Sequence, residues 1–218
     1  MFDDWRPRAI VFDCDGLLVD TEGCWTLAET ELFRARGLTF AAADKEALIG
    51  VAVPAACAFL AELFDDGSSA EQIERELLIR VAEIVGEEGR AMAGAVELMA
   101  LALERLPTAV ASNSPRALLD QALAVGGFAG LPAVTVAADE VRRPKPAPDL
   151  YLTACARLGV DPPEALAVED SAPGIRAASA AGMRTVGVPT LRGVDIGAER
   201  TLSSLADPQL LALLDPAG

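Results

Sequence analysis

Two aspartates follow the first apolar run of the chain, two residues apart. Asp13 and Asp15 come directly after residues 9–12, and Gly16 is next. In open α/β sheets, functional side chains gather at the carboxyl ends of strands. Gly16 permits a sharp turn and leaves backbone amides free to face an anion. The segment therefore predicts carboxylate chemistry on a bound anion, with a strand that merely ends in a polar turn as the alternative.

A second polar segment, Ser112-Asn113-Ser114, follows another apolar run at residues 108–111. Hydroxyls and free amides at the N-terminus of a helix suit a phosphate group. Pro115 comes next, at a position where a proline favours the first turn of a helix. The alternative is that Ser114 or Asn113 only caps that helix.

A lysine between two prolines supplies the positive charge that such a site needs. Pro144 and Pro146 restrict the backbone around Lys145 and place it on a stiff loop. Arginine dominates the basic residues, and Lys45 is the only other lysine. Lys145 is thus a candidate for a compact charge in a site. The alternative is an ordinary solvated loop cation.

Two adjacent acids close a further apolar run. Glu169 and Asp170 follow residues 166–168 and would repel each other unless a cation shared their site. Together with Asp13 and Asp15, Asp170 would form an all-oxygen cluster of the kind that suits Mg²⁺. The alternative is that Asp170 or Ser171 caps the helix that follows.

The elements that must position these residues alternate between strands and helices. Short apolar runs at residues 9–12, 108–111, 133–136, 166–168 and 185–188 are typical of buried parallel strands. Residues 20–90 contain no convincing strand, and Ser69 with Gln72 resembles a capping box ahead of a helix whose inner face carries Ile73, Leu77, Val81 and Ile84. We predict an α/β fold, a Rossmann-like parallel-sheet core of residues 1–18 and 88–218 with an inserted all-α cap at 19–87.

The composition excludes several kinds of catalysis. The 218 residues include no histidine, so Ser-His-Asp and Cys-His catalysis, phosphohistidine and His-ligated metals are impossible. Acid–base work falls to other groups, and 33 Asp+Glu make carboxylates the leading candidates. The net charge of −15 disfavours nucleic acid and anionic membranes as partners, because both attract basic surfaces.

The cysteines and the N-terminus bear on the compartment. The four cysteines form no C-x-x-C pair, and scattered free cysteines are usual for core residues in a reducing cytosol: Cys14, Cys24, Cys57 and Cys155. The first residues lack the basic-then-apolar order of a signal peptide, and no apolar stretch approaches the ~18 residues of a membrane span. We expect a cytoplasmic protein without a membrane partner.

In this order and spacing, the four polar segments resemble the motifs of the haloacid dehalogenase superfamily, specifically its phosphotransferases. Asp13-Cys14-Asp15-Gly16 is similar to motif one, Ser112 to motif two, Lys145 to motif three and Glu169-Asp170 to motif four. The helical block after motif one is similar to the small α-helical cap of the β-phosphoglucomutase and phosphoglycolate phosphatase subgroup. The resemblance extends from Ile10 to Val188.

The resemblance implies a role for each motif residue. Asp13 would attack phosphorus and form an aspartyl-phosphate, and Asp15 would act as general acid and then as general base. Ser112, Asn113 and Lys145 would bind the transferring phosphoryl group, near the Gly16 turn. Mg²⁺ would be held by Asp13, the Asp15 carbonyl and Asp170, with Glu169 as a ligand directly or through water.

The implied activity is a Mg²⁺-dependent phosphatase acting on a small phosphorylated metabolite, a sugar or sugar-acid phosphate, as a monomer. Asp15 argues against the family's dehalogenases, which lack this aspartate. The rival is a β-phosphoglucomutase-like sugar-phosphate mutase, but Trp25 stands where that enzyme has a cap histidine. A non-enzymatic phosphoacceptor module is a further alternative, which Asp15 disfavours.

The cap is expected to set specificity. The candidates to contact substrate are Glu22, Trp25, Ile49, Gly50 and Arg80, with Arg75 as a further basic residue. The alternative for Trp25 and Ile49 is a place in the core of the cap. The alternative for Arg80 is an ion pair with Glu76, four residues earlier on the same helix.

Overall fold

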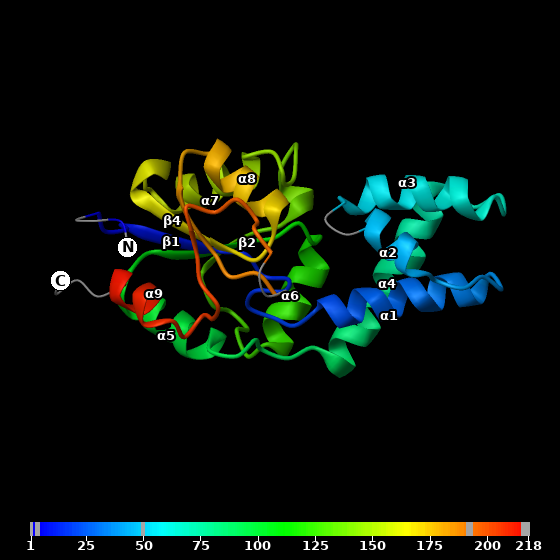
Figure 1. Ribbon diagram of the computed structural model, residues 1–218, viewed down its shortest axis with the longest axis horizontal. Coiled ribbons are helices and arrows are strands. Elements are labelled where there is room, and N and C mark those ends of the chain that lie inside the picture. Colours follow the sequence, from blue (N-terminus) through cyan, green and yellow to red (C-terminus); the bar gives the residue numbers. More distant parts are fainter. Residues whose placement is uncertain (1, 3–4, 49–50, 191–193, 215–218) are drawn as a thin grey trace. The chain divides into compact units, whose positions relative to one another are not determined.

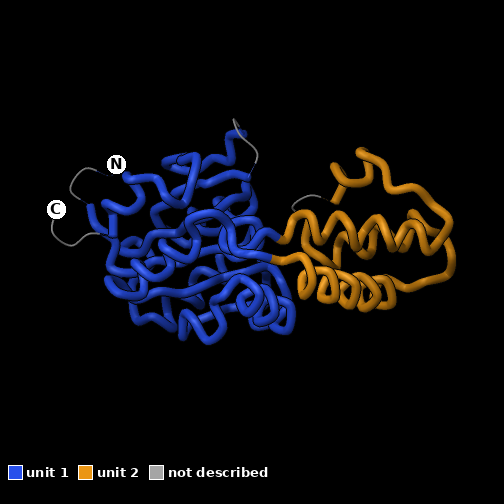
Figure 2. Tube along the Cα trace, turned by 90° about the horizontal axis from the view of Figure 1, so that it is seen from below, with its two compact units in different colours: residues 1–20, 90–218 blue, residues 21–89 orange. Residues whose placement is uncertain are grey.

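The computed structural model describes residues 2, 5–48, 51–190 and 194–214. The chain divides into two compact units, which Figure 2 shows in different colours. Unit 1 consists of Met1–Asp20 and Arg90–Gly218, and unit 2 consists of Thr21–Gly89. Each unit is described below by itself.

Unit 1 is built on a parallel six-stranded sheet with the strand order β3-β2-β1-β4-β5-β6. The predicted α/β class is therefore confirmed. The strands are β1 (Ala9–Phe12), β2 (Thr108–Ala111), β3 (Val134–Val136), β4 (Ala165–Glu169), β5 (Arg184–Gly187) and β6 (Arg200–Thr201). Each of the five apolar runs forms a strand, whereas β6 was not predicted. Both residues of β6 are exposed, so this edge strand has no apolar pattern to read.

Helices cover both faces of the sheet, as Figure 1 shows, with α7 and α8 on one face and α5, α6 and α9 on the other. These helices are α5 (Ala95–Arg105), α6 (Arg116–Val125), α7 (Asp149–Leu158), α8 (Ala172–Ala180) and α9 (Pro208–Leu213), with two 3₁₀ turns at Ala138–Glu140 and Pro162–Glu164. Since both faces are covered, every residue of β1, β2 and β4 is buried. On the α7 side the strands contribute mainly alanines, such as Ala109 and Ala167, which leave room for Leu150 and Tyr151.

The chain leaves and re-enters unit 1 at adjacent points. Val19 and Ala91 form an antiparallel bridge. The Asp20 amide donates to the Arg90 carbonyl at 2.9 Å, and the Met92 amide donates to the Leu18 carbonyl at the same distance. The two connections are thus held together by backbone hydrogen bonds inside unit 1.

Within its described residues, 21–48 and 51–89, unit 2 contains four helices: α1 (Glu22–Ala35), α2 (Ala42–Leu48), α3 (Val53–Phe64) and α4 (Ala70–Glu88). The long helix α4 packs against both α1 and α3. It begins at the predicted capping box, in which Gln72 N donates to Ser69 Oγ and Ser69 N donates to the Gln72 side chain. Its buried face ends at Val85 rather than at Ile84, which is only half-buried.

All four cysteines are free and buried, as expected for small core residues. Across the described ranges, the structure contains no helix with both the length and the apolar character needed to cross a membrane.

Candidate active site

The carboxyl end of β1 presents Asp13 at the edge of the sheet. The Asp13 amide donates to the Val168 carbonyl at 3.0 Å, so pairing with β4 continues one residue past the strand. The chain then turns sharply, with the Val19 amide donating to the Cys14 carbonyl at 3.0 Å. Gly16 lies in this turn with a φ of +79°, a conformation that other residues adopt rarely. Asp13 is therefore fixed by the sheet, and its side chain is buried.

Two serine hydroxyls at the end of β2 bind Asp15. Ser112 Oγ and Ser114 Oγ donate to Asp15 Oδ2 at 2.8 and 2.9 Å. The next helix, α6, has Pro115 as its N-cap and no capping side chain. The interpretation of Ser114 or Asn113 as a helix cap is therefore wrong. Both hydroxyls serve a carboxylate that lies far away in the sequence.

Lys145 is buried between two carboxylates. Its Nζ donates to Asp13 Oδ1 and, at 2.6 Å, to Glu169 Oε1. The Asn113 side chain fixes the backbone at this point, since Lys145 N donates to Asn113 Oδ1 at 2.8 Å and Asn113 Nδ2 donates to the Lys145 carbonyl at 3.2 Å. Only 4% of Lys145 is exposed, so its interpretation as a solvated loop cation is wrong.

Glu169, at the end of β4, is fully buried and accepts five hydrogen bonds. Its Oε1 accepts from Lys145 Nζ and, at 2.7 Å, from Tyr151 OH. Its Oε2 accepts from the amides of Asp170 and Ser171 at 3.1 and 3.2 Å, and from Ser171 Oγ at 2.9 Å. Ser171 also caps α8, as one of the alternatives predicted.

Asp170 lies against the Gly16 turn. Thr190 Oγ1, which follows β5, donates to Asp170 Oδ2 at 3.3 Å. A Cβ at Gly16 would lie 2.4 Å from the same oxygen, so only glycine allows this close approach. Gly16 and Thr190 also line a pocket of about 150 Å³ at this edge of the sheet.

The carboxylate oxygens of three of these acids lie close together. Ligand oxygens of Asp13, Glu169 and Asp170 lie within 4.8 Å of one another. An all-carboxylate donor set is typical of sites for hard divalent cations such as Mg²⁺. The residues present therefore fit the predicted metal.

The raised pKa values of Asp13 and Asp170 indicate that the carboxylate cluster needs additional positive charge to be fully ionised. Burial raises the pKa of Asp13 to about 8; Lys145 offsets part of this effect, and Glu169 and Asp15 add to it. Burial, together with Asp13 and Glu169, also raises the pKa of Asp170 well above its usual range. Burial acts to lower the pKa of Lys145, but the adjacent carboxylates raise it by more than burial lowers it. The pKa of Lys145 is therefore well above its usual range, and this lysine stays protonated. One buried lysine among these carboxylates leaves room for a second cation.

The structure brings most of the predicted site residues together: Asp13, Asp15, Gly16, Ser112, Asn113, Lys145, Glu169 and Asp170. Three side chains bonded to these residues were not predicted: Ser114, Tyr151 and Thr190. Ser114 stood in the segment predicted to bind a phosphate, with a helix cap as the alternative, and its bond to Asp15 was not foreseen. Tyr151 is the only tyrosine of the chain, a weak signal that composition alone offered.

The predicted specificity residues belong to unit 2. Glu22 is exposed and Trp25 is half-buried, both on α1. Arg80 pairs with Glu76 at 3.0 Å and with Glu31 at 3.4 Å, so the alternative interpretation of an ion pair holds for Arg80. Ile49 and Gly50 lie outside the described residues.

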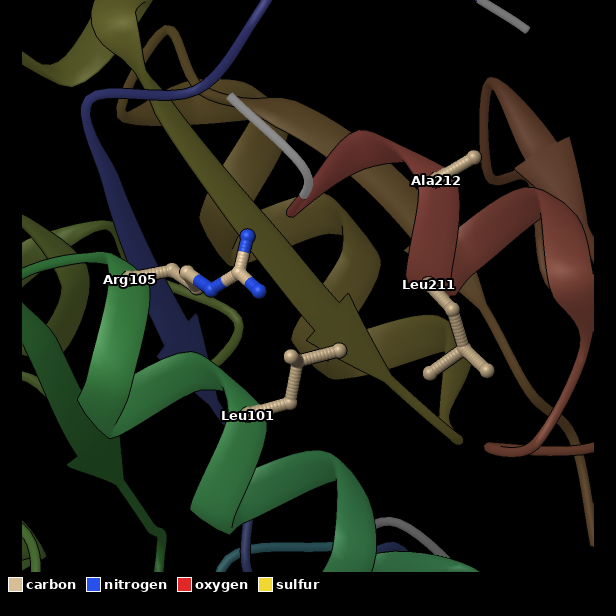
Figure 3. Close-up of a pocket in the computed structure, with 4 residues that line it drawn as sticks. All are labelled: Leu101, Arg105, Leu211 and Ala212. Atoms are coloured by element: carbon tan, nitrogen blue, oxygen red, sulfur yellow. The ribbon is translucent and has the colours of Figure 1, made fainter. Parts of the chain in front are cut away.

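A larger pocket, of about 220 Å³, lies elsewhere in unit 1. Figure 3 shows its lining, with Leu101 and Arg105 from α5 and Leu211 and Ala212 from α9. None of these four side chains is an acid or a nucleophile. The chemistry therefore stays with the carboxylate cluster.

Comparisons with known proteins show the family of the chain. The sequence profile of the haloacid dehalogenase-like hydrolase family matches residues 7–182. The chain is 31% identical over 189 residues to hexitol phosphatase B of Escherichia coli (strain K12), covering 84% of this chain and 85% of the relative.

Two solved structures show the same fold along nearly the whole chain. CbbY from Rhodobacter sphaeroides, in complex with phosphate, has a TM-score of 0.84 and 29% identity, covering 96% of this chain and 99% of its own. A putative β-phosphoglucomutase from Thermotoga maritima has a TM-score of 0.71 and 25% identity, covering 89% of this chain and 94% of its own.

The chain thus belongs to the haloacid dehalogenase-like hydrolase family, and the resemblance inferred from the four motifs is confirmed. It is a phosphoric monoester hydrolase of this superfamily, in the subgroup that includes β-phosphoglucomutase-like proteins.

Proposed function

We propose that this protein is a Mg²⁺-dependent phosphatase that hydrolyses a small sugar or sugar-acid phosphate through an aspartyl-phosphate intermediate. The observation that carries the proposal is the arrangement at the end of β1. There, the Asp13 carboxylate is bonded to a buried lysine, while Asp15 is bonded to two serine hydroxyls. A nucleophile and a separate acid–base group are the two parts that this chemistry requires.

In the first step, an Asp13 oxygen attacks phosphorus as the bond from phosphorus to the leaving oxygen breaks. Asp15, in its protonated form, gives its proton to that oxygen, and the alcohol leaves. Ser112 and Ser114 both donate to Oδ2 of Asp15 and so fix the orientation of the carboxyl group. The products of this step are the free alcohol and phosphorylated Asp13.

In the second step, water attacks the phosphorus of the aspartyl-phosphate. Asp15 takes a proton from the water, and the bond between phosphorus and the Asp13 oxygen breaks. Inorganic phosphate is released, and both aspartates return to their initial state. This cycle needs no imidazole, which is consistent with a chain that has no histidine.

Positive charge must accompany the phosphoryl group through both steps. Lys145 is already bonded to Asp13, and together with the Asn113 amide it would bind the phosphoryl oxygens. Ser112 would join them by turning its hydroxyl from Asp15 to the phosphoryl group, while Ser114 keeps its bond to Asp15. Asp13, Asp170 and the Asp15 carbonyl would hold Mg²⁺. When bound, Mg²⁺ supplies charge that favours the ionised form of Asp13 and offsets its repulsion from the phosphate.

The substrate class rests on the similarity to hexitol phosphatase B. Unit 2 would select the substrate through residues such as Glu22 and Trp25. We further propose a cytoplasmic monomer that acts on free metabolites rather than on nucleic acid or membranes, in line with the net charge of −15.

The test is phosphate release from a panel of hexitol, sugar and sugar-acid phosphates, with and without Mg²⁺. We expect turnover only with Mg²⁺, and a phosphoryl group on the Asp13 peptide in acid-quenched samples analysed by mass spectrometry. Absence of turnover across the panel would contradict the proposal. Formation of glucose 6-phosphate from β-glucose 1-phosphate and its bisphosphate would instead establish a mutase.

A further inference from the structure

Building on the proposed function, we propose that Tyr151 is a positioning residue: its hydroxyl holds the Glu169 carboxylate in the orientation in which it binds Lys145. In this arrangement Glu169 anchors the lysine that binds the phosphoryl group. It is not a direct ligand of Mg²⁺, although its oxygens lie near those of Asp13 and Asp170. The cation is then held by Asp13 and Asp170 together with backbone oxygen.

Hydrogen-bond donors already surround the Glu169 carboxylate. A carboxylate offers about four lone-pair positions to donors or metals. Glu169 already accepts five hydrogen bonds, two on Oε1 and three on Oε2. A metal could enter only by displacing the lysine, the tyrosine hydroxyl or the donors of residues 170–171. Neither Asp13 nor Asp170 is surrounded in this way by the hydrogen bonds described.

The Glu169 carboxylate also has little space in which to move. Glu169 is fully buried, and a Cβ placed on Gly174 of α8 would lie 1.7 Å from its Oε1. The α8 backbone therefore closes directly over the carboxylate. Tyr151 is also fully buried, so its hydroxyl has no access to bulk water as an alternative partner. Movement of Glu169 toward a metal would leave that hydroxyl unsatisfied.

Tyr151 contacts both members of the pair formed by Lys145 and Glu169. Its hydroxyl donates to Glu169 Oε1 at 2.7 Å, and Lys145 Nζ lies 5.1 Å from the centre of its ring. The ring face attracts the ammonium while the hydroxyl orients the carboxylate that binds it. One side chain thus fixes the position of Lys145 through two different interactions.

The experiment replaces Tyr151 by phenylalanine, which removes one hydroxyl and no charge. Thr108→Val is the matched control, because Thr108 is buried in the same unit and donates its hydroxyl to a backbone carbonyl at 2.9 Å. For each protein we measure the affinity for Mg²⁺ by calorimetry without substrate, the Ki of inorganic phosphate, and kcat and KM with an aryl phosphate.

For Tyr151→Phe we expect kcat to fall by about tenfold, the usual scale for groups that orient a functional side chain, with weaker phosphate inhibition. The Mg²⁺ affinity should stay the same or rise, because the change frees a lone pair on Glu169. Thr108→Val should alter neither kcat nor Mg²⁺ affinity. An unchanged kcat in Tyr151→Phe, or a loss of Mg²⁺ affinity by more than about twofold, would overturn the proposal.

A crystal structure of the wild-type protein with Mg²⁺ gives a second test that needs neither a variant nor turnover. We expect oxygens of Asp13 and Asp170 at the Mg²⁺ bond length of about 2.1 Å, and Glu169 still bonded to Lys145 and Tyr151. A Glu169 oxygen at that bond length would refute the inference. Wild-type protein that binds Mg²⁺ but releases no phosphate would refute the proposed function instead, while this structure and the Mg²⁺ affinities still decide the role of Glu169.

Discussion

Charged side chains are used differently in the two units. In unit 1, Asp13, Lys145 and Glu169 are almost completely buried and form one continuous group. In unit 2, Arg36 and Arg80 pair with acids whose side chains are about a third or more exposed. Exposed pairs contribute little to stability, and buried charges cost desolvation energy. A buried group of this kind is therefore better explained by chemistry than by stability.

The largest effect is expected from Asp13, the proposed nucleophile. Asp13→Asn should lower kcat at least about 10⁴-fold, because an amide cannot form the phosphorylated intermediate. Asp161→Asn is the control, since this exposed aspartate lies in unit 1 and makes no capping bond with its side chain. Steady-state assays with an aryl phosphate and Mg²⁺ measure both. Comparable activity of the two variants would place the chemistry elsewhere.

The two lysines allow a direct comparison of the units. Lys145→Met should lower the free energy of unfolding by about 3–5 kcal/mol without Mg²⁺, because it leaves buried carboxylates unpaired. Lys45 Nζ lies 3.4 Å from Glu29 Oε2 and its side chain is 21% exposed, so Lys45→Met should cost less than Lys145→Met. Urea unfolding measures both changes. Equal losses would remove the distinction between the units.

A pair of helical glycines gives a smaller contrast. Gly174→Ala should destabilise unit 1 by about 1–3 kcal/mol and reduce activity, because the added Cβ collides with Glu169. Gly23 of α1 has no atom within 4 Å of an added Cβ. Gly23→Ala should therefore stabilise the protein by up to about 1 kcal/mol, because alanine has the higher helix propensity. Thermal unfolding separates the two, and a stable, active Gly174→Ala variant would contradict this packing.

The smallest effect concerns Glu29 in unit 2. Burial raises the pKa of Glu29, and Lys45 offsets only part of the effect. The folded state then binds the proton more tightly than the unfolded state. The stability gained from this tighter proton binding is fully present below the usual glutamate pKa of about 4.3. It is lost as the pH rises through the raised pKa that Glu29 has in the folded protein. Glu29→Gln should therefore be more stable than wild type at pH 7, and the difference should vanish in acid. Lower stability at pH 7 would contradict this expectation.

Sequence patterns predicted those parts of the molecule that depend on neighbouring residues. Apolar runs located five strands, and Ser69 with Gln72 located the start of α4. The ends of consecutive parallel strands meet at one edge, which explains why the motif residues of the core come together.

The partners of these residues could not be predicted in the same way. Ser114 and Asp15 are 99 residues apart, so their bond depends on the finished sheet. The hydroxyl of Tyr151 reaches Glu169 only because α7 packs on the sheet in one particular register. Likewise, the burial of Lys145 follows from elements that surround it in space, not from the prolines beside it.

The bridge between Val19 and Ala91 has a consequence for how such a protein is assembled. Asp20 and Arg90 are already joined by a hydrogen bond, so a short turn could connect them directly. Residues 21–89 are then an insertion that the core tolerates without a change in its own strand order. A different insertion could be exchanged at the same two points. With unit 2 proposed as the part that selects the substrate, such an exchange could change the substrate while the residues of the reaction in unit 1 stay the same.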